Sequence, residues 1–403
     1  VEMSQLAHIL VAGEEDIWTR RAVRLAAGNR VTDLLTLTLE QPLPKNLVAH
    51  RDAIVELAQA IGRGGTVDQL QSIIGQLVRL PAEPGYQAIQ FGGLDILLRT
   101  ATGRKLSLAT ILTHGERSVA PKNVANVFAR AEKLAASSQA AVTDRSLAIA
   151  LLAYPSRLSE TLVRSCQPGQ PQAIRLAALQ SLARRKELTP WPGLLDRFAS
   201  ESPVVRRALL DGALRSSQRT GLLLDRIENK AIKAAEIDQT RIKRLLNTSQ
   251  PALRSRATKL LADTVPADRK QVLADYQVAL KLKATPQAGE LIFRKQCATC
   301  HRIGKIGHNV APDIADSRSK QPSQLLTHIL QPNRVIDSNY ISYSVITNEG
   351  QVLTGILVTE TSTSITLRQA EGKEVTLLRS QVEALRSNGV SLMPEGLEKN
   401  ISH

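Results

Sequence analysis

The first part of the chain, up to about residue 283, repeats apolar positions with the 3.6-residue period of amphipathic helices. Pro, Gly, Ser and Asn separate the helical segments. Three segments share a starting Pro, an apolar stripe and an Arg directly after the first apolar position. They are PQAIRLAALQSLAR (171–184), PVVRRALLDGALRS (203–216) and PALRSRATKLLADTV (251–265). Pro in the first turn and a continuous apolar stripe favour helices that stack on one another.

The recurrence of this pattern resembles a HEAT-type solenoid, in which helix pairs stack into an array. The Arg residues that mark it are Arg175, Arg206 and Arg254. Earlier segments such as DIWTRRAVRLAAG (16–28) match it loosely, and an irregular all-helical domain is the alternative. Residues 1–283 contain no metal-spaced ligand set, no Gly-rich phosphate loop and no nucleophile motif. We therefore expect them to form a docking surface.

The pattern changes after LKATPQ, which ends at residue 287. A short helix, the stretch CATCH, a Gly/Pro loop and a second helix precede a region of alternating β-branched residues at 340–378. Its runs YISYSVI, QVLTGILV, SITLRQ and EVTLL are separated by turn sequences, which predicts four short strands. We expect irregular and short helical structure from Arg379 onward. The sequence thus predicts a mainly α chain with a second domain at 284–403 that carries a β insertion.

Composition agrees with a mainly helical fold and locates the charge. Aromatic residues make up only 3% of the 403 positions, and no apolar run is long enough to span a membrane. Of the net charge of +15, residues 286–403 hold 12 Lys and Arg against 11 Asp and Glu, which leaves 40 against 26 for the rest. That basic first part could attract acidic proteins, nucleic acid or anionic lipid. Because the chain opens with VEMSQLAHIL, we expect a mature or excised fragment.

Two of the three cysteines lie in the stretch QCATCHRI, at Cys297 and Cys300, and His301 follows directly. This C-x-x-C-H spacing is the attachment signature of c-type haem, in which each thiol adds across a vinyl group and the imidazole binds the iron. Composition would produce the motif by chance in roughly 4 of 10,000 such chains, so coincidence does not explain it. The distant Cys166 is expected to be a buried apolar residue.

Two other sites use paired cysteines. A structural zinc site needs four Cys or His ligands in two spaced pairs, and no second C-x-x-C occurs in the chain. A thioredoxin-like dithiol lies between a strand and a helix, whereas a helix is predicted before Cys297. Both remain alternatives to haem attachment.

The residues around CATCH fit haem. Thr285 and Pro286 suit a helix start, and Gly289, Phe293 and Cys297 then recur every four residues on one helix face. We expect the Phe293 ring to form part of a wall against the haem. A ligating imidazole needs a partner for its second ring nitrogen, and the carbonyl of Pro312 is placed to supply one.

The second axial position of the iron has one main candidate. Met393, in SLMPEG, is one of only two methionines, and a thioether ligand favours ferrous iron and raises the potential. His308 and His328 are competitors. His308 is close to His301 in sequence, and His328 is expected on a helix surface.

The C-terminal part resembles a known family. GELIFRKQCATCHRIGKIGHNVAPDI is similar to the opening of a class I cytochrome c, and the segments from QPNRVIDSNYISYSVI to VSLMPEGLEK resemble the haem-binding domain of large exported dehydrogenase-like proteins of planctomycetes and verrucomicrobia. That domain often follows helical repeats there. The resemblance covers about residues 286–400 and implies Cys297 and Cys300 as thioether anchors, His301 as proximal ligand and Met393 as distal ligand.

Two features depart from a compact class I cytochrome. The 91 residues between His301 and Met393 are more than it needs, and the β region accounts for the excess. Nothing after Met393 matches its C-terminal helix, so we expect a more open haem crevice or one that another chain closes.

We therefore expect one covalent haem c with His/Met ligation and electron transfer between redox partner proteins, a dehydrogenase or a small carrier. The expected compartment is the periplasm or another exported location, and no enzymatic turnover is expected. A haem-based sensor or interaction scaffold is the alternative function. Nucleic-acid binding by the basic part is not expected, since haem c is attached outside the cytoplasm.

Overall fold

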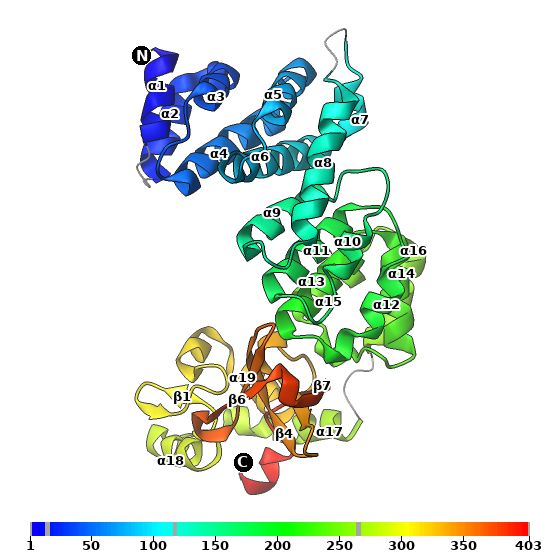
Figure 1. Ribbon diagram of the computed structural model, residues 1–403. Helices are drawn as coiled ribbons and strands as arrows, with labels where there is room; N and C mark the ends of the chain where they lie inside the picture. Colours follow the sequence, from blue (N-terminus) through cyan, green and yellow to red (C-terminus); the bar gives the residue numbers. More distant parts are fainter. Residues whose placement is uncertain (1, 13–16, 116–118, 263–266, 402–403) are drawn as a thin grey trace. The chain divides into compact units, whose positions relative to one another are not determined.

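The computed structural model describes residues 2–12, 17–115, 119–262 and 267–401. Its described part is mainly helical with a small antiparallel sheet near the C-terminus, which confirms the predicted mainly α class (Figure 1). The chain divides into two compact units: unit 1 comprises residues 1–167 and 173–185, and unit 2 comprises residues 168–172 and 186–403. The predicted domain boundary at residue 283 lies inside unit 2.

Unit 1 is built from helices that pack on near neighbours along the chain, such as α4 on α6 and α8 on α9. Its helices are α1 (Met3–Ala12), α2 (Ile17–Ala27), α3 (Val31–Glu40), α4 (Leu47–Gly64), α5 (Val67–Arg79), α6 (Pro84–Gly103), α7 (Leu108–Leu112), α8 (Pro121–Ala136), α9 (Val142–Leu151), α10 (Glu160–Arg164) and, from Ala173, α11 (Gln172–Arg184). Cys166 is buried here, as expected.

Helix α5 illustrates how sequence sets these elements. The Thr66 hydroxyl accepts a hydrogen bond from the Gln69 N–H, and the Gln69 side chain accepts one from the Thr66 N–H. This reciprocal capping box satisfies two backbone donors at the helix start. Leu70, Ile74 and Leu77 then lie on one face and are fully buried. A polar cap and an apolar stripe thus determine where α5 starts and which face packs.

Unit 2 begins with helices that carry two of the predicted repeats. Its helices are α12 (Trp191–Asp196), α13 (Pro203–Ala213), α14 (Ser217–Glu228), α15 (Gln239–Leu246), α16 (Pro251–Ala262), α17 (Ala267–Asp275), α18 (Pro286–Gln296) and α19 (Pro322–Leu330). Of the stripe predicted on α13, Val205, Leu209, Gly212 and Ala213 are buried and Ala208 is half-buried. On α16 only Ala257 of the predicted stripe is buried, and residues 263–265 of that segment lie outside the described residues.

The sheet of unit 2 has five antiparallel strands in the order β6-β5-β4-β3-β7. The strands are β3 (Ile341–Thr347), β4 (Val352–Glu360), β5 (Ser364–Arg368), β6 (Glu374–Leu378) and β7 (Val382–Ser391). The four strands predicted from residues 340–378 are all present. Alternate residues of β3, namely Ile341, Tyr343 and Val345, point into a core that Leu357, Ile365, Leu367 and Leu385 complete.

The prediction of irregular and short helical structure from Arg379 onward was wrong over Val382–Ser391, which form β7, and is confirmed by the short 3-10 turns Arg379–Gln381 and Leu397–Asn400. The strand pairs with β3 along its length, with register shifts near both ends. Ala, Asn and Gly within β7 have low strand propensity, and the shifts break the alternation by which a strand is recognised. Pairing with β3, about forty residues earlier, creates this strand.

A buried polar network joins the sheet to the helices of unit 2. The Arg206 guanidinium on α13 lies 2.5 Å from Glu236 Oε1 and 3.2 Å from the Tyr343 hydroxyl on β3. Ser387 on β7 donates to the same Glu236 oxygen at 2.7 Å. The Tyr343 hydroxyl donates to the Glu201 carbonyl at 2.7 Å, and burial raises the pKa of Tyr343 to about 12. The sheet is therefore fastened to residues far earlier in the chain.

Among the described helices, none combines the length and the apolar character required to cross a bilayer.

Candidate functional site

Helix α18 leads into the CATCH stretch. Pro286 occupies its first turn, and Thr285 precedes it as expected, although the Thr285 side chain makes no capping hydrogen bond. None of the residues of α18 is buried, and Leu291 is 70% exposed. The helix therefore presents its apolar side chains outward.

The two cysteines and the histidine lie on one tight turn at the end of α18. The Cys297 N–H donates to the Phe293 carbonyl at 2.8 Å, and the His301 N–H donates to the Cys297 carbonyl at 2.8 Å. The Cys300 N–H also donates to the Cys297 carbonyl, at 3.1 Å. The compact turn that the two-residue gap predicts is thus present. We call residues 297–301 the attachment turn.

A short loop folds back against the attachment turn. It contains the two-residue strands β1 (Arg302–Ile303) and β2 (Ile306–Gly307). The His308 N–H donates to the Ala298 carbonyl at 3.0 Å, and the N–H groups of Val310 and Ala311 donate to the Cys300 carbonyl at 3.0 and 2.8 Å. Backbone hydrogen bonds therefore hold this loop on the turn.

Gly307 makes the close approach of the loop possible. Its φ of +85° lies in the left-handed region that favours glycine, and a Cβ there would lie 2.1 Å from the His301 carbonyl oxygen. Any other residue at this position would push the loop off the turn. Sequence inspection noted Gly307 only as part of a Gly/Pro loop.

The imidazole of His301 is oriented by Pro312. Its Nδ1 lies 2.8 Å from the Pro312 carbonyl oxygen, which is the contact that the sequence predicted. A carbonyl can only accept, so Nδ1 carries the proton and Nε2 keeps a lone pair. This tautomer suits Nε2 as a ligand for a metal.

An ion pair holds the residue after Pro312. Arg302 donates from Nε to Asp313 Oδ2 at 3.0 Å, and Asp313 Oδ1 accepts from the Ala315 N–H at 2.9 Å. The Ala315 N–H, together with Arg302, lowers the pKa of Asp313, so this carboxylate is charged at neutral pH. Neither residue was singled out from sequence, because charged loop residues carry no motif.

Both thiols of the attachment turn are half-buried, and neither cysteine is paired in a disulfide. Burial raises the pKa of Cys297 and of Cys300, so both are neutral thiols at neutral pH. In the described part of the chain, no group of three or more His, Cys, Asp or Glu side chains is arranged to hold a metal ion.

The surroundings of the attachment turn have little core of their own. Across the described residues 267–330, the buried hydrophobic side chains are Val310 and Leu330. Several large apolar side chains in the same stretch are exposed instead: Val278, Leu280, Leu282, Leu291, Ile292, Ile303 and Ile329. Exposed apolar side chains in this number along one stretch of chain are typical of a surface that binds another group.

The remaining predicted residues lie around this turn or apart from it. Phe293 is half-buried one helical turn before Cys297, and Gly289 has open space where a side chain would be. Met393 lies in a different loop, where its N–H donates to Ser391 Oγ at 3.1 Å. No hydrogen bond among the described residues joins this loop to residues 297–312. The distal role of Met393 therefore stays a prediction.

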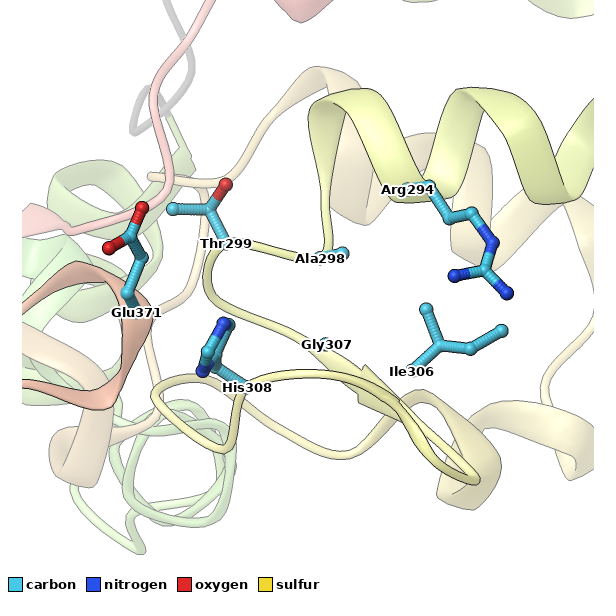
Figure 2. A pocket seen from close by; sticks show the side chains of 7 residues that line it. All are labelled: Arg294, Ala298, Thr299, Ile306, Gly307, His308 and Glu371. Carbon is cyan, nitrogen blue, oxygen red and sulfur yellow. The ribbon is translucent and has the colours of Figure 1, made fainter.

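The Met393 loop is fixed from another side. Asn333, just after α19, accepts from the Ser391 N–H at 2.7 Å and donates to Glu395 at 2.9 Å. His328 is exposed on α19, as expected, and His308 lines a cavity of about 260 Å³ behind the attachment turn (Figure 2).

The sheet also touches the attachment turn. The Glu371 N–H, in the 3-10 turn η7 (Ala370–Gly372) between β5 and β6, donates to the Thr299 carbonyl at 2.9 Å. This contact carries no sequence signal, because the partners are distant in sequence and the bond uses backbone atoms.

Comparison with known protein families found none whose pattern matches the chain, and comparison with curated proteins found none similar to it.

Proposed function

We propose that residues 284–403 form a c-type cytochrome domain of the exported dehydrogenase-associated kind, with one covalent haem, and that residues 1–283 form a HEAT-like array that docks it. The observation that carries the proposal is the attachment turn. It brings Cys297, Cys300 and His301 together and orients the imidazole through the Pro312 carbonyl. The adjacent histidine distinguishes the haem-attachment signature C-x-x-C-H from a plain C-x-x-C dithiol.

The thiols supply the covalent attachment. Cys297 and Cys300 would hold the haem: the S–H of each would add across one vinyl group, with sulfur bonding to one vinyl carbon and the proton going to the other. The addition needs no external oxidant. Neither cysteine is paired in a disulfide, so both thiols are available for this role.

His301 would bind the iron through Nε2. The Pro312 carbonyl keeps the proton on Nδ1, and the Arg302–Asp313 ion pair holds the backbone on which Pro312 lies. Haem, when bound, supplies a one-electron couple between ferric and ferrous iron. The chain supplies ligands, orientation and shielding from water.

The exposed apolar side chains around the turn also support haem. Residues such as Leu291, Ile292 and Ile303 lie on elements that adjoin the cysteines along the chain. A large apolar ring would give such side chains a partner, at about 25 cal/mol for each Å² removed from water. Phe293 is the proposed aromatic contact.

Met393 is the proposed distal ligand. If Met393 and His301 both held the iron, no ligand position would stay open, and the domain would carry electrons without turnover of its own. The loop that carries Met393 is held by Asn333, which favours a fixed position.

The proposed partners are redox proteins: a dehydrogenase domain or protein as donor and a small carrier as acceptor, in the periplasm or another exported compartment. The excess positive charge of the first 285 residues favours acidic partner surfaces.

The test is expression with a cytochrome c maturation system, followed by denaturation and acid-acetone extraction. We expect haem to stay with the polypeptide in the wild type and in Cys166→Ala. It should be absent from the Cys297→Ala/Cys300→Ala variant. Haem that extracts from the wild type would overturn the proposal.

Met393→Ala tests the distal ligand separately. We expect loss of the low-spin Met-ligated spectrum, binding of carbon monoxide at neutral pH, and a lower potential, within the range of about 0.8 V that axial ligands span. An unchanged oxidised spectrum would remove Met393 as ligand. Carbon monoxide binding by the wild type would favour a haem-based sensor instead.

A further inference from the structure

The β5–β6 hairpin, which carries η7, contacts the attachment turn and the loop that follows it at two backbone carbonyls. Beside the bond from the Glu371 N–H to the Thr299 carbonyl, Arg368 at the end of β5 donates from Nη1 to the Asn309 carbonyl at 3.2 Å. The first carbonyl belongs to the attachment turn and the second to the loop that folds back on it. One hairpin therefore holds both parts.

The backbone of Glu371 adopts an unusual conformation to make its contact. Its φ of 60° lies in the left-handed region, which residues other than glycine rarely adopt. The side chain is exposed. Gly372 follows, also with a positive φ. This conformation directs the Glu371 N–H to the Thr299 carbonyl.

The hairpin that carries η7 is firmly anchored in the sheet. Gln369 donates from its N–H to the Lys373 carbonyl at 2.8 Å and from its side chain to the Thr354 carbonyl at 2.9 Å. Gly355 on β4 allows a close approach, since a Cβ there would lie 2.6 Å from the Arg368 carbonyl oxygen. The contact to the attachment turn thus starts from a rigid element.

The hairpin approaches the attachment turn at Ala298 and Thr299, the two residues between the cysteines. The cavity behind the turn is walled by Ala298, Thr299, His308 and Glu371, and its walls do not include Cys297 or Cys300 (Figure 2). In Figure 2, Glu371 comes from the hairpin toward Thr299, and His308 lies below them.

We propose that η7 and Arg368 form a clamp that supports the attachment turn from behind and positions Cys297 and Cys300 before haem is attached. Glu371 and Arg368 are positioning residues in this scheme, and the haem part of it rests on the proposed function. The clamp transfers the rigidity of the sheet to a region that buries few apolar side chains.

A pair of substitutions at Glu371 separates the backbone effect from loss of the carboxylate. Glu371→Gly favours the left-handed conformation, and Glu371→Val strongly disfavours it; both remove the same exposed side chain. In haem-free protein we expect Glu371→Val to exchange the amide hydrogens of His308, Val310 and Ala311 about tenfold faster. Glu371→Gly should match the wild type.

Thiol alkylation gives a second readout. Cys297 and Cys300 should react severalfold faster in Glu371→Val than in Glu371→Gly, while the buried Cys166 serves as an internal standard. Amides of β3 should exchange equally in both variants. Equal exchange and alkylation rates in the Gly and Val variants would overturn the clamp.

Arg368 is tested with its own control. Arg368→Gln removes both the bond to Asn309 and the ion pair with Glu374, whereas Glu374→Gln removes only the ion pair. We expect faster exchange of the Ala311 amide in Arg368→Gln alone. Equal effects of the two variants would remove Arg368 from the clamp.

Haem loading distinguishes the clamp from the proposed function. With limiting maturation proteins, we expect Glu371→Val to carry severalfold less covalent haem than Glu371→Gly. Wild type without covalent haem would overturn the proposed function while the exchange comparison still stands. The clamp alone would be overturned by a different result: the wild type carries covalent haem, and Glu371→Val and Glu371→Gly show equal haem loading and equal amide exchange.

Discussion

The sheet and the attachment region belong to the same unit but are stabilised in different ways. In the sheet, Tyr343, Val345 and Leu367 are fully buried in a continuous apolar core. The attachment region, residues 267–330, has Val310 and Leu330 as its buried hydrophobic side chains among those described, and many exposed ones. The sheet has a continuous apolar core, whereas the attachment region is held mainly by hydrogen bonds, some of them to the sheet.

This difference indicates where a ligand would contribute to folding. Hydrophobic burial is the main driving force for a stable core, and many apolar side chains of the attachment region are exposed to solvent. An apolar cofactor would complete that core. The sheet would then act as the preformed support and the attachment region as the part that haem stabilises.

The largest expected effect is on hydrogen exchange with and without haem. We expect haem attachment to slow the amides of residues 297–311 by at least about a hundredfold, because the ligand completes their core. Amides of β3 and β4 should change little. Mass spectrometry of the holoprotein beside the Cys297→Ser/Cys300→Ser variant measures this, and equal slowing in both regions would contradict the comparison.

Next in size is the loss of the buried ion pair that fastens the sheet. Glu236→Ala leaves Arg206 buried without its carboxylate and should lower the free energy of unfolding of unit 2 by about 3–5 kcal/mol. Urea unfolding followed by Trp191 fluorescence, in a Trp18→Phe background, reports unit 2. Glu236→Gln keeps an acceptor oxygen and should cost less; a loss below about 1 kcal/mol for the Ala variant would count against the network.

Leucine substitutions compare the two regions directly in haem-free protein. Leu367→Ala creates a cavity in the sheet core and should cost about 2–5 kcal/mol in the same unfolding assay. Leu291→Ala, at an exposed position of α18, should change stability by no more than about 0.5 kcal/mol. Similar costs at both positions would show that the attachment region has a core of its own.

The smallest effect concerns pH. Because the pKa of Asp313 is lowered in the folded protein, its ion pair with Arg302 stabilises the Pro312 segment at neutral pH. This contribution is lost as pH falls below the ordinary carboxyl range through the lowered pKa. The protection of the Ala315 amide against hydrogen exchange, measured relative to a free peptide, should fall over that pH range. Asp313→Ala, which has no side-chain acceptor for the Ala315 N–H, should show the low protection at all pH values; an unchanged pH dependence in that variant would contradict the assignment.

The local parts of the site follow from sequence. The spacing of Cys297, Cys300 and His301 predicts their shared turn, and Pro312 was predicted as the partner of the imidazole. Both involve residues within about fifteen positions of one another. Helices such as α13 and strands β3 to β6 were likewise predictable, because their apolar periods are regular.

The distant contacts were not predictable in this way. Arg206 was noted as part of a repeat pattern, yet the fold buries it against Glu236 and Tyr343. Strand β7 lacks strand propensity and exists through its pairing with β3. Glu371 gave no signal as an exposed turn residue, although its N–H reaches Thr299.

The sequence by itself determined the chemistry: a dithiol and a histidine at haem-attachment spacing, a helical first part and a β-rich segment. The tertiary structure decided what supports that chemistry. A buried ion pair fastens the sheet to helices, and a hairpin of the sheet contacts the attachment turn. Side-chain type and local period are encoded over a few residues. Pairing between distant segments depends on which surfaces the whole fold buries together, and no local pattern carries that information.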